Sequence, residues 1–359
     1  MDADWVMLHS LFRHGAGIRP RRTFLVQHSV ICFCLTLGLA LGAVLPGLVA
    51  AEFPQAVITS STVRATVYLP DPQNGYYRAT RFDWSGVVAS LESGGHRYFG
   101  KWFDRYDPKI HDAIMGPVEE FLTKGAGLGY DAAAPGGSFV RIGVGAVRKP
   151  EEPAYRRYNT YEILDTGKWT VRSGPDWIEF VQVLTGVNGY AYVYRKRLSL
   201  AKDRPELAID HSLRNTGKKT IETSVYDHNF YILDSQPTGP DFVVRFPFAP
   251  RATSDLAGFA EIRGKEIVFL REMTGEQTVL TDLEGYGGTA ADYDIRVENH
   301  KTGAGVRQRS DRRMTKLVFW SNPRTVCPEA YIDMRIEPGR EFKWRISYGF
   351  YTVSSTAKQ

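Results

Sequence analysis

The chain alternates apolar and polar residues over long stretches, and this period of two constrains its fold more than any other feature. The clearest case is residues 342–350, where aromatic and aliphatic residues take every second position. Side chains of a β-strand point to alternate faces, so the pattern predicts a half-buried strand. Residues 207–213 alternate in the same way, and Asn-Thr-Gly at 215–217 follows as a turn signal.

Similar strand patterns recur along most of the chain, at residues 139–147, 177–184, 190–200, 242–248 and 316–320. Only residues 109–123 hint at a helix, and Pro117 interrupts them. Strands follow strands across Gly, Pro and Asn turns, without the helical crossovers that a parallel sheet needs. The sequence therefore predicts an all-β fold, a large antiparallel β-sandwich of two packed sheets.

The first 51 residues differ from the rest and predict an export signal. Arginines between residues 13 and 22 precede an apolar run at 29–49, and Ala50-Ala51 supplies small residues for cleavage. The mature protein is then expected to be periplasmic or secreted. Residues 21–25 also fit a twin-arginine export motif, although paired arginines occur by chance in basic leaders. An uncleaved membrane anchor is the alternative.

Residues 52–359 are predicted to form a single domain. The whole chain has a formal net charge of +5, and four of its arginines lie in the leader, so the remainder is nearly balanced. This balance argues against a nucleic-acid binder, which carries a concentrated basic stripe. Cys327 is the one cysteine beyond the leader, which excludes an internal disulfide. The glycine-rich residues 124–137 lack a nucleotide-loop context and predict a surface loop, a candidate rim of the site.

His228 and Glu329 are the residues best suited to proton transfer. Each lies in a strand pattern, and in each strand it shares the polar face, His228 with Tyr226 and Glu329 with Tyr331. A histidine and a carboxylate on the open face of a sheet are the minimum needed to move protons on a bound substrate. We expect both side chains to look outward from the core.

Five stretches of the chain resemble the galactose mutarotase (aldose 1-epimerase) superfamily, whose members share a large antiparallel β-sandwich. They are residues 74–91, the Tyr-Phe-Gly of 98–100 with Arg105 after it, residues 207–217, residues 227–239 with the Asp-His-Asn-Phe-Tyr segment, and residues 326–342 with the glutamate and the Pro-Gly-Arg-Glu turn. The order and spacing of these stretches, rather than any one of them, carry the resemblance.

The resemblance implies an activity and a set of site residues. His228 would be the general acid and Glu329 the base that interconvert the anomers of a mono- or oligosaccharide, with no metal and no cofactor. Arg105 would hold a sugar hydroxyl. Further substrate-binding candidates on or beside the same strands are Tyr226, Asp227, Asn229, Arg81 and Tyr331. After removal of the signal, no stable insertion in a membrane is expected.

Two departures from the family pattern keep other functions open. The family usually has a second histidine before the acid, but residues 115–121 contain none, and His96 and His111 lie nearby out of register. The paired arginine motif is reduced to Arg105. A non-catalytic carbohydrate-binding protein, or a polysaccharide lyase or hydrolase on the same fold, are therefore the alternatives. His211 lies on an apolar strand face and is expected to be a core residue.

Overall fold

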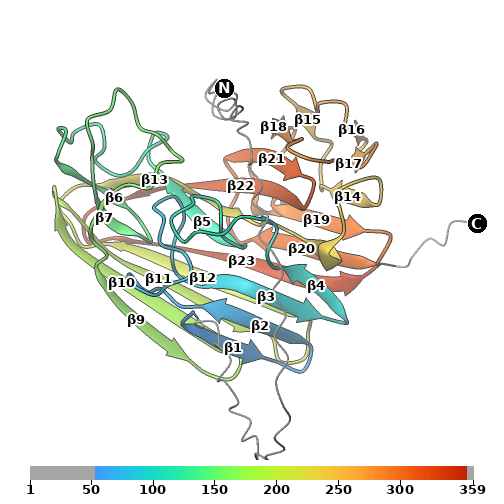
Figure 1. Cartoon of the computed structure of the whole chain (residues 1–359), viewed down its shortest axis with the longest axis horizontal. Helices are drawn as coiled ribbons and strands as arrows, with labels where there is room; N and C mark the ends of the chain where they lie inside the picture. Colours follow the sequence, from blue (N-terminus) through green and yellow to red (C-terminus); the bar gives the residue numbers. More distant parts are fainter. Residues whose placement is uncertain (1–52, 354–359) are drawn as a thin grey trace, which may run out of the picture. The chain divides into compact units, whose positions relative to one another are not determined.

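The computed structural model describes residues 53–353, so the predicted export signal and its boundary at residue 51 lie outside the described residues. Within this range the regular structure is β-strand, with two short 3₁₀ turns, η2 (Leu233–Ser235) and η3 (Ala290–Asp292). Figure 1 shows the strands as stacked layers joined by loops. None of the described elements is a helix with the length and apolarity needed to cross a membrane.

A ten-stranded antiparallel sheet forms the largest layer. In spatial order its strands are β16 (Ala260–Arg263), β17 (Glu266–Phe269), β14 (Phe242–Arg245), β19 (Asp294–Asn299), β20 (Ala304–Ser310), β23 (Glu341–Thr352), β12 (Glu206–Asn215), β11 (Tyr190–Leu200), β10 (Trp177–Val187) and β9 (Lys168–Ser173).

Three smaller sheets accompany it. The six-stranded sheet runs β15 (Arg251–Ala252), β18 (Val279–Glu284), β21 (Lys316–Asn322), β22 (Thr325–Ile336), β13 (Ile221–His228) and β5 (Val118–Leu122). The four-stranded sheet runs β1 (Gln55–Thr59), β2 (Val63–Tyr68), β3 (Val87–Ser93) and β4 (His96–Phe99), and the three-stranded sheet runs β6 (Ser138–Arg141), β7 (Gly145–Arg148) and β8 (Ile163–Asp165).

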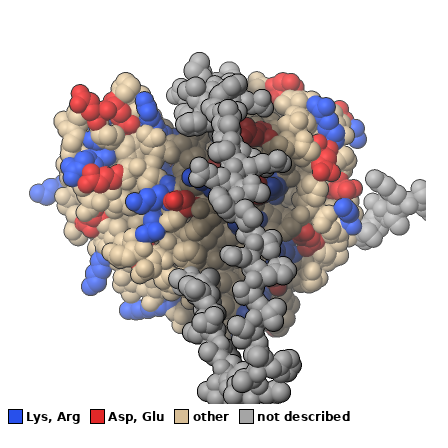
Figure 2. Space-filling model, in the orientation of Figure 1, with Lys and Arg blue, Asp and Glu red and all other residues tan. Residues whose placement is uncertain are grey.

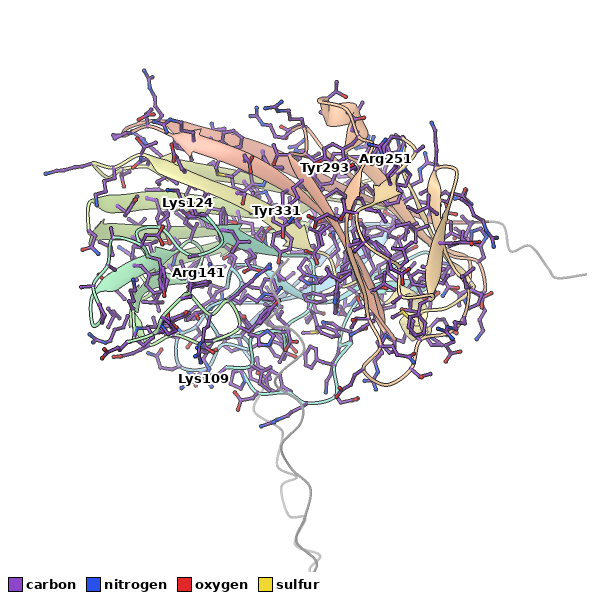
Figure 3. The ribbon with its side chains drawn as sticks, turned by 90° about the horizontal axis from the view of Figure 1, so that it is seen from above. Lys109, Lys124, Arg141, Arg251, Tyr293 and Tyr331 are labelled. Atoms are coloured by element: carbon purple, nitrogen blue, oxygen red, sulfur yellow. The ribbon has the colours of Figure 1, made fainter. Side chains whose placement is uncertain are left out.

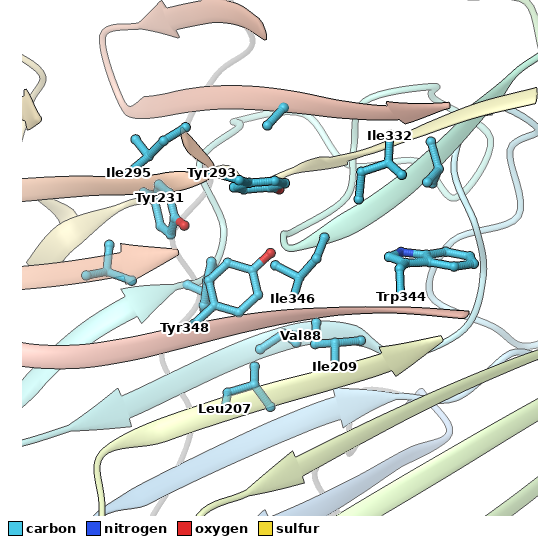
Figure 4. Packing of buried hydrophobic residues seen from close by; sticks show 14 of the residues in the cluster. Val88, Leu207, Ile209, Tyr231, Tyr293, Ile295, Ile332, Trp344, Ile346 and Tyr348 are labelled. Atoms are coloured by element: carbon cyan, nitrogen blue, oxygen red, sulfur yellow. The ribbon is translucent and has the colours of Figure 1, made fainter. Parts of the chain in front are cut away.

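The predicted all-β, antiparallel sandwich is confirmed, with two local corrections. Residues 139–147 are a hairpin of β6 and β7 rather than one strand, because Gly143 turns the chain with a φ of 81°. Residues 109–123 contain no helix and end in strand β5. Side chains from β23 show why the alternation predicted its strand so well: Trp344, Ile346 and Tyr348 are buried, and they point into the layer between the sheets (Figure 4).

The inner face of the ten-stranded sheet packs against two of the other sheets. Phe121 of β5 lies 5.4 Å from the ring of Tyr194 of β11, and Tyr98 of β4 lies 4.5 Å from the ring of Phe350. Both contacts join buried residues of one continuous apolar core. The candidate site lies on the other face of the six-stranded sheet, which points away from the ten-stranded sheet.

The strand register decides which side chains share that second face. Tyr226 of β13 pairs with Tyr331 of β22 on one side and with Glu120 of β5 on the other. Glu329 pairs with Val318 of β21. Because side chains opposite each other in an antiparallel pair point to the same face, these residues and His228, two positions after Tyr226, form one surface.

Candidate functional site

His228 and Glu329 meet on this surface although 101 positions separate them in the sequence. Nε2 of His228 lies 3.2 Å from Oε1 of Glu329. Their strands are neighbours in the six-stranded sheet, so the contact is set by the pairing of β13 with β22. The two proton-transfer candidates are therefore brought together as one pair.

The expectation that this face is open needs correction, because the pair is buried. His228 is 4% and Glu329 is 5% exposed. Aromatic rings enclose the imidazole: Phe230 stacks on it at 3.7 Å between ring centroids, and Phe82 and Trp320 approach its edge at 5.6 and 5.3 Å. These rings belong to a second apolar cluster, which covers the outer face of the sheet. Nδ1 of His228 is buried and has no hydrogen-bond partner among the described residues.

Burial also sets the protonation of the pair. It raises the pKa of Glu329 to about 8, although the charges of Arg157 and Arg81 act in the opposite direction. Burial holds the pKa of His228 well below its usual 6.5, and the positive charge of Arg81 adds to this effect. Both groups then favour their neutral forms near pH 7, and the pair holds one proton, on the carboxyl of Glu329.

A cluster of arginines around one carboxylate lies beside the pair. Arg157 binds Glu120 through two nitrogens, at 3.0 and 2.7 Å, and Nε of Arg81 binds it at 3.0 Å. The hydroxyl of Tyr226 donates to Glu120 at 2.6 Å and accepts from Nη2 of Arg157 at 2.6 Å. Burial opposes ionisation of Glu120, but Arg157 and Arg81 lower its pKa far below the ordinary value, so it is a carboxylate.

Arg141 completes the cluster in a different way. Nη2 of Arg141 lies 3.5 Å from Glu120, while its other contacts are to the backbone carbonyls of Thr80, Arg81 and Ala126. These contacts tie the loop before β3 to the segment around β6, so Arg141 is a positioning residue. Figure 3 shows Arg141 and Arg251 in opposite halves of the molecule, with Tyr331 and Tyr293 between them.

The cluster reaches solvent at Arg157 and Tyr158. The side chain of Arg157 is 30% exposed, and Tyr158 is 39% exposed. The Tyr158 ring contacts the guanidinium of Arg81 at 5.1 Å and the ring of His111 at 4.8 Å. His111 therefore adjoins the site despite its position out of register in the sequence. Burial lowers its pKa to about 4 against the pull of Asp112.

Three predicted binding residues lie elsewhere. Asp227 and Asn229 are fully buried on the core side, where Tyr348 of the ten-stranded sheet lies 2.6 Å from Asp227 and 2.9 Å from Asn229. Alternation along β13 places Asp227 opposite to His228, so the two neighbours cannot face one ligand. Arg105 is an exposed residue of the β4–β5 loop. Arg81, Tyr226 and Tyr331 lie on the site face, where the rings of the two tyrosines stack at 4.4 Å.

Sequence reasoning missed Glu120 and Arg157. Glu120 lies in a short strand that had hinted at a helix, and Arg157 lies in the loop between β7 and β8, where no periodicity marks a face. The only available signal was the Glu-Glu pair at 119–120, an unusual composition for a buried strand. His96 is also placed apart from the site, bound to Asp234 at 2.8 Å beside a surface hollow.

Glu119, the neighbour of Glu120, organises a second charged network inside the core. It binds the ammonium of Lys196, and its Oε1 lies 2.6 Å from Nε2 of His211. Burial opposes its ionisation, but Lys196 and then His211 hold the pKa of Glu119 at about 2. His211 is buried and stacks on Trp344 at 4.5 Å, the core position expected for it.

The described residues contain no group of three or more His, Cys, Asp or Glu side chains placed to hold a metal ion. The chemistry that this arrangement can perform with its own side chains is proton transfer by the His228–Glu329 pair, next to hydrogen-bond donors on arginine and tyrosine. On the face shown in Figure 2, Lys and Arg side chains lie interspersed with Asp and Glu.

The architecture is the large antiparallel β-sandwich that the resemblance predicts. No family model matches the sequence, and no curated protein matches it by sequence. Solved structures do match. A galactose mutarotase related enzyme from Lactobacillus acidophilus superposes with a TM-score of 0.52 at 14% identity, over 84% of this chain and 98% of that one.

Two further structures agree. The GalM/aldose epimerase homologue from C. elegans has a TM-score of 0.51 at 13% identity, over 84% of this chain and 100% of that one. A galactose mutarotase-like protein from Clostridium acetobutylicum has a TM-score of 0.50 at 13% identity, over 83% and 95% of the two chains. The chain therefore has the galactose mutarotase-like fold, which confirms the resemblance at the level of architecture.

Proposed function

We propose that the protein interconverts the anomers of a sugar by acid–base catalysis, as an aldose 1-epimerase-like enzyme. The single observation that carries this proposal is the contact of 3.2 Å between His228 and Glu329. Anomer exchange requires one group to take the proton of the C1 hydroxyl and another to protonate the ring oxygen. Both oxygens are bonded to the same carbon, so the two side chains must be neighbours, as they are here.

The proton count of the pair also suits the reaction. The pair must hold one proton that it can give to the ring oxygen, and it must accept a second proton from the C1 hydroxyl. Ring closure reverses both transfers. In the ligand-free chain this proton lies on Glu329, which makes Glu329 the donor and His228 the acceptor in ring opening. This assignment reverses the roles that the resemblance implies, and both assignments contain the same number of protons.

The neighbouring side chains supply contacts for the sugar. Tyr331 and Trp320 present rings on the same face as the pair, and apolar faces of sugar rings stack on aromatic side chains. The buried Nδ1 of His228 lacks a partner among the described residues, and a hydroxyl of the sugar would satisfy it. These features favour an occupied site over a histidine that serves the packing alone.

The test is the rate of anomer exchange of fresh sugar solutions, followed by polarimetry, for the protein and for His228→Ala and Glu329→Gln. Each positioned proton donor or acceptor typically contributes roughly 10²–10⁴-fold, so we expect either variant to lose that much. Thermal melting shows whether each variant is folded. Wild-type rates in both folded variants would refute the mechanism, and binding of sugar without any exchange would support the carbohydrate-binding alternative.

Export is a separate part of the proposal. It rests on the basic and apolar pattern of residues 1–51, which ends in Ala50-Ala51. Mass spectrometry of the protein from its own cells should find a chain that starts at Glu52. A chain that retains its first residues would instead support the membrane-anchor alternative.

A further inference from the structure

The arginine cluster carries more positive charge than its acidic partner can balance. Three guanidinium groups, from Arg81, Arg141 and Arg157, lie within 3.5 Å of the single carboxylate of Glu120. Arg81 and Arg141 are 8% and 2% exposed, and Glu120 is fully buried. Two positive charges are therefore left over in a largely desolvated place, where unbalanced charge is costly.

The other charged groups nearby do not cancel this excess. Lys316 lies over the ring of Tyr331 at 5.6 Å, and it is paired with Asp282 at 3.2 Å. Asp112 is 3.8 Å from Nδ1 of His111, and its own side chain is 39% exposed. Glu329, which lies on the same face, is 3.2 Å from His228 and forms no salt bridge with an arginine among the described residues.

The excess charge lies about one sugar ring away from the proton-transfer pair. Tyr226, whose hydroxyl binds Arg157, is two residues before His228 on the same face of β13, a step of roughly 7 Å. The rings of Tyr226 and His228 are 6.0 Å apart. A monosaccharide with its anomeric carbon at the pair would extend its far end to the two guanidinium groups of Arg81 and Arg157.

We propose that the sugar bound in this site carries an anionic group, a carboxylate or a phosphate, which is held by the buried Arg81 and by Arg157 at the solvent-exposed edge. Arg157 is suited to this role because its contacts with Glu120 use Nε and Nη2, which leaves Nη1 to donate to an oxyanion, and because its side chain is partly open to solvent. Arg141 stays bound to backbone carbonyls and keeps the cluster in place. The inference rests on the proposed function and adds the class of substrate to it.

Matched sugars test the charge directly on the full chain. Anomer exchange is measured by NMR exchange spectroscopy for galacturonate, its neutral methyl ester, glucose 6-phosphate and glucose. We expect kcat/KM for one anionic sugar to exceed that of its neutral counterpart roughly 10- to 100-fold, the usual gain of a charge-assisted hydrogen bond. A preference for galacturonate over its ester identifies a carboxylate, and one for glucose 6-phosphate over glucose identifies a phosphate. Equal values for charged and neutral sugars would overturn the inference.

The variant Arg157→Gln then shows whether the arginine cluster causes the preference for the anionic sugar. This variant should lose activity on the preferred anionic sugar about tenfold more than on its neutral counterpart. The control is Arg345→Gln, which removes an arginine bound to Asp210 through two nitrogens, at 2.6 and 2.9 Å, in the ten-stranded sheet. The control should change neither rate. A folded Arg157→Gln that loses the same factor on all sugars would contradict the inference.

Binding separates this inference from the proposed function. If the protein exchanges no sugar but galacturonate or glucose 6-phosphate still binds by calorimetry, and Arg157→Gln weakens that binding, the epimerase proposal fails and the anionic ligand stands. If exchange occurs with neutral sugars alone, the epimerase proposal stands and the anionic ligand fails. Cleavage of a polyuronate by the wild type but not by Arg157→Gln would likewise keep the anion and replace the epimerase with a lyase.

Discussion

Glu329 should make the fold less stable at high pH, and replacing it with glutamine should remove this weakness while it removes activity. The carboxyl is buried on the site face, and burial raises its pKa from an ordinary 4.5 to about 8. Glutamine has nearly the same shape and stays neutral at every pH. Glu329→Gln therefore resembles the protonated wild type and cannot resemble the ionised one.

The sign and size of the effect follow from proton linkage. Because the folded chain binds this proton more tightly than the unfolded chain, the contribution of Glu329 to stability is fully present below pH 4.5. It is lost as the pH rises through about 8. The upper limit is about 5 kcal/mol, since one pKa unit corresponds to about 1.4 kcal/mol. We expect about 2 kcal/mol to be measured, because buried sites relax and admit water.

The assay is urea unfolding of the wild type and of Glu329→Gln at pH 5 and pH 9. The stability of the variant relative to the wild type should rise by about 2 kcal/mol between these pH values, while all other titrating groups cancel in the comparison. Glu284→Gln, at an exposed glutamate paired with Arg251 at 3.4 Å, is the matched control and should show no such rise. The same relative stability at both pH values would refute the assignment of a buried, protonated Glu329.

Three further outcomes follow from the networks. Activity should fall as the pH rises through about 8, because the carboxyl of Glu329 then loses the proton that it would donate; a pH profile of kcat/KM that stays flat from 6 to 10 would contradict this. Lys196→Met should destabilise the fold by about 3–5 kcal/mol in urea unfolding, since it leaves Glu119 buried with one partner fewer, and adding Glu119→Gln should recover part of the loss. Tyr226→Phe should lower stability by about 1–3 kcal/mol by calorimetry, because its hydroxyl bridges the buried Glu120 and Arg157; an unchanged melting temperature would argue against that bridge.

Alternation predicted the architecture because it reports burial directly. In β23 each buried residue is followed by one on the other face, and the strand lies where residues 342–350 predicted it. The same rule predicted that His228 and Tyr226 share a face, as do Glu329 and Tyr331. It could not predict that loops bury this face, because the loops that cover the six-stranded sheet show no period at all.

The contact between His228 and Glu329 could not be predicted from alternation, because alternation gives the face of each residue but not which strands are neighbours in the sheet. The pairing of β13 with β22 fixes it, and the resemblance to known sugar epimerases was the only guide to that pairing in the sequence. The resemblance also predicts Asp227 and Asn229 in the site, because they flank His228 in the matching segment. Asp227 contradicts the alternation rule, which by itself assigns it to the core beside Tyr348.

The consecutive glutamates of β5 have a consequence for how this protein can change over evolutionary time. Glu119 faces the interior and Glu120 faces the side of the sheet with His228 and Glu329, so inserting or deleting one residue between 118 and 122 would exchange their surroundings. Such an event would disrupt the charged network of the core and the arginine cluster together, whereas point substitutions alter one of them at a time. Descendants of this chain can therefore vary the exposed segment around Arg157 without loss of the fold, while the length of β5 stays constant.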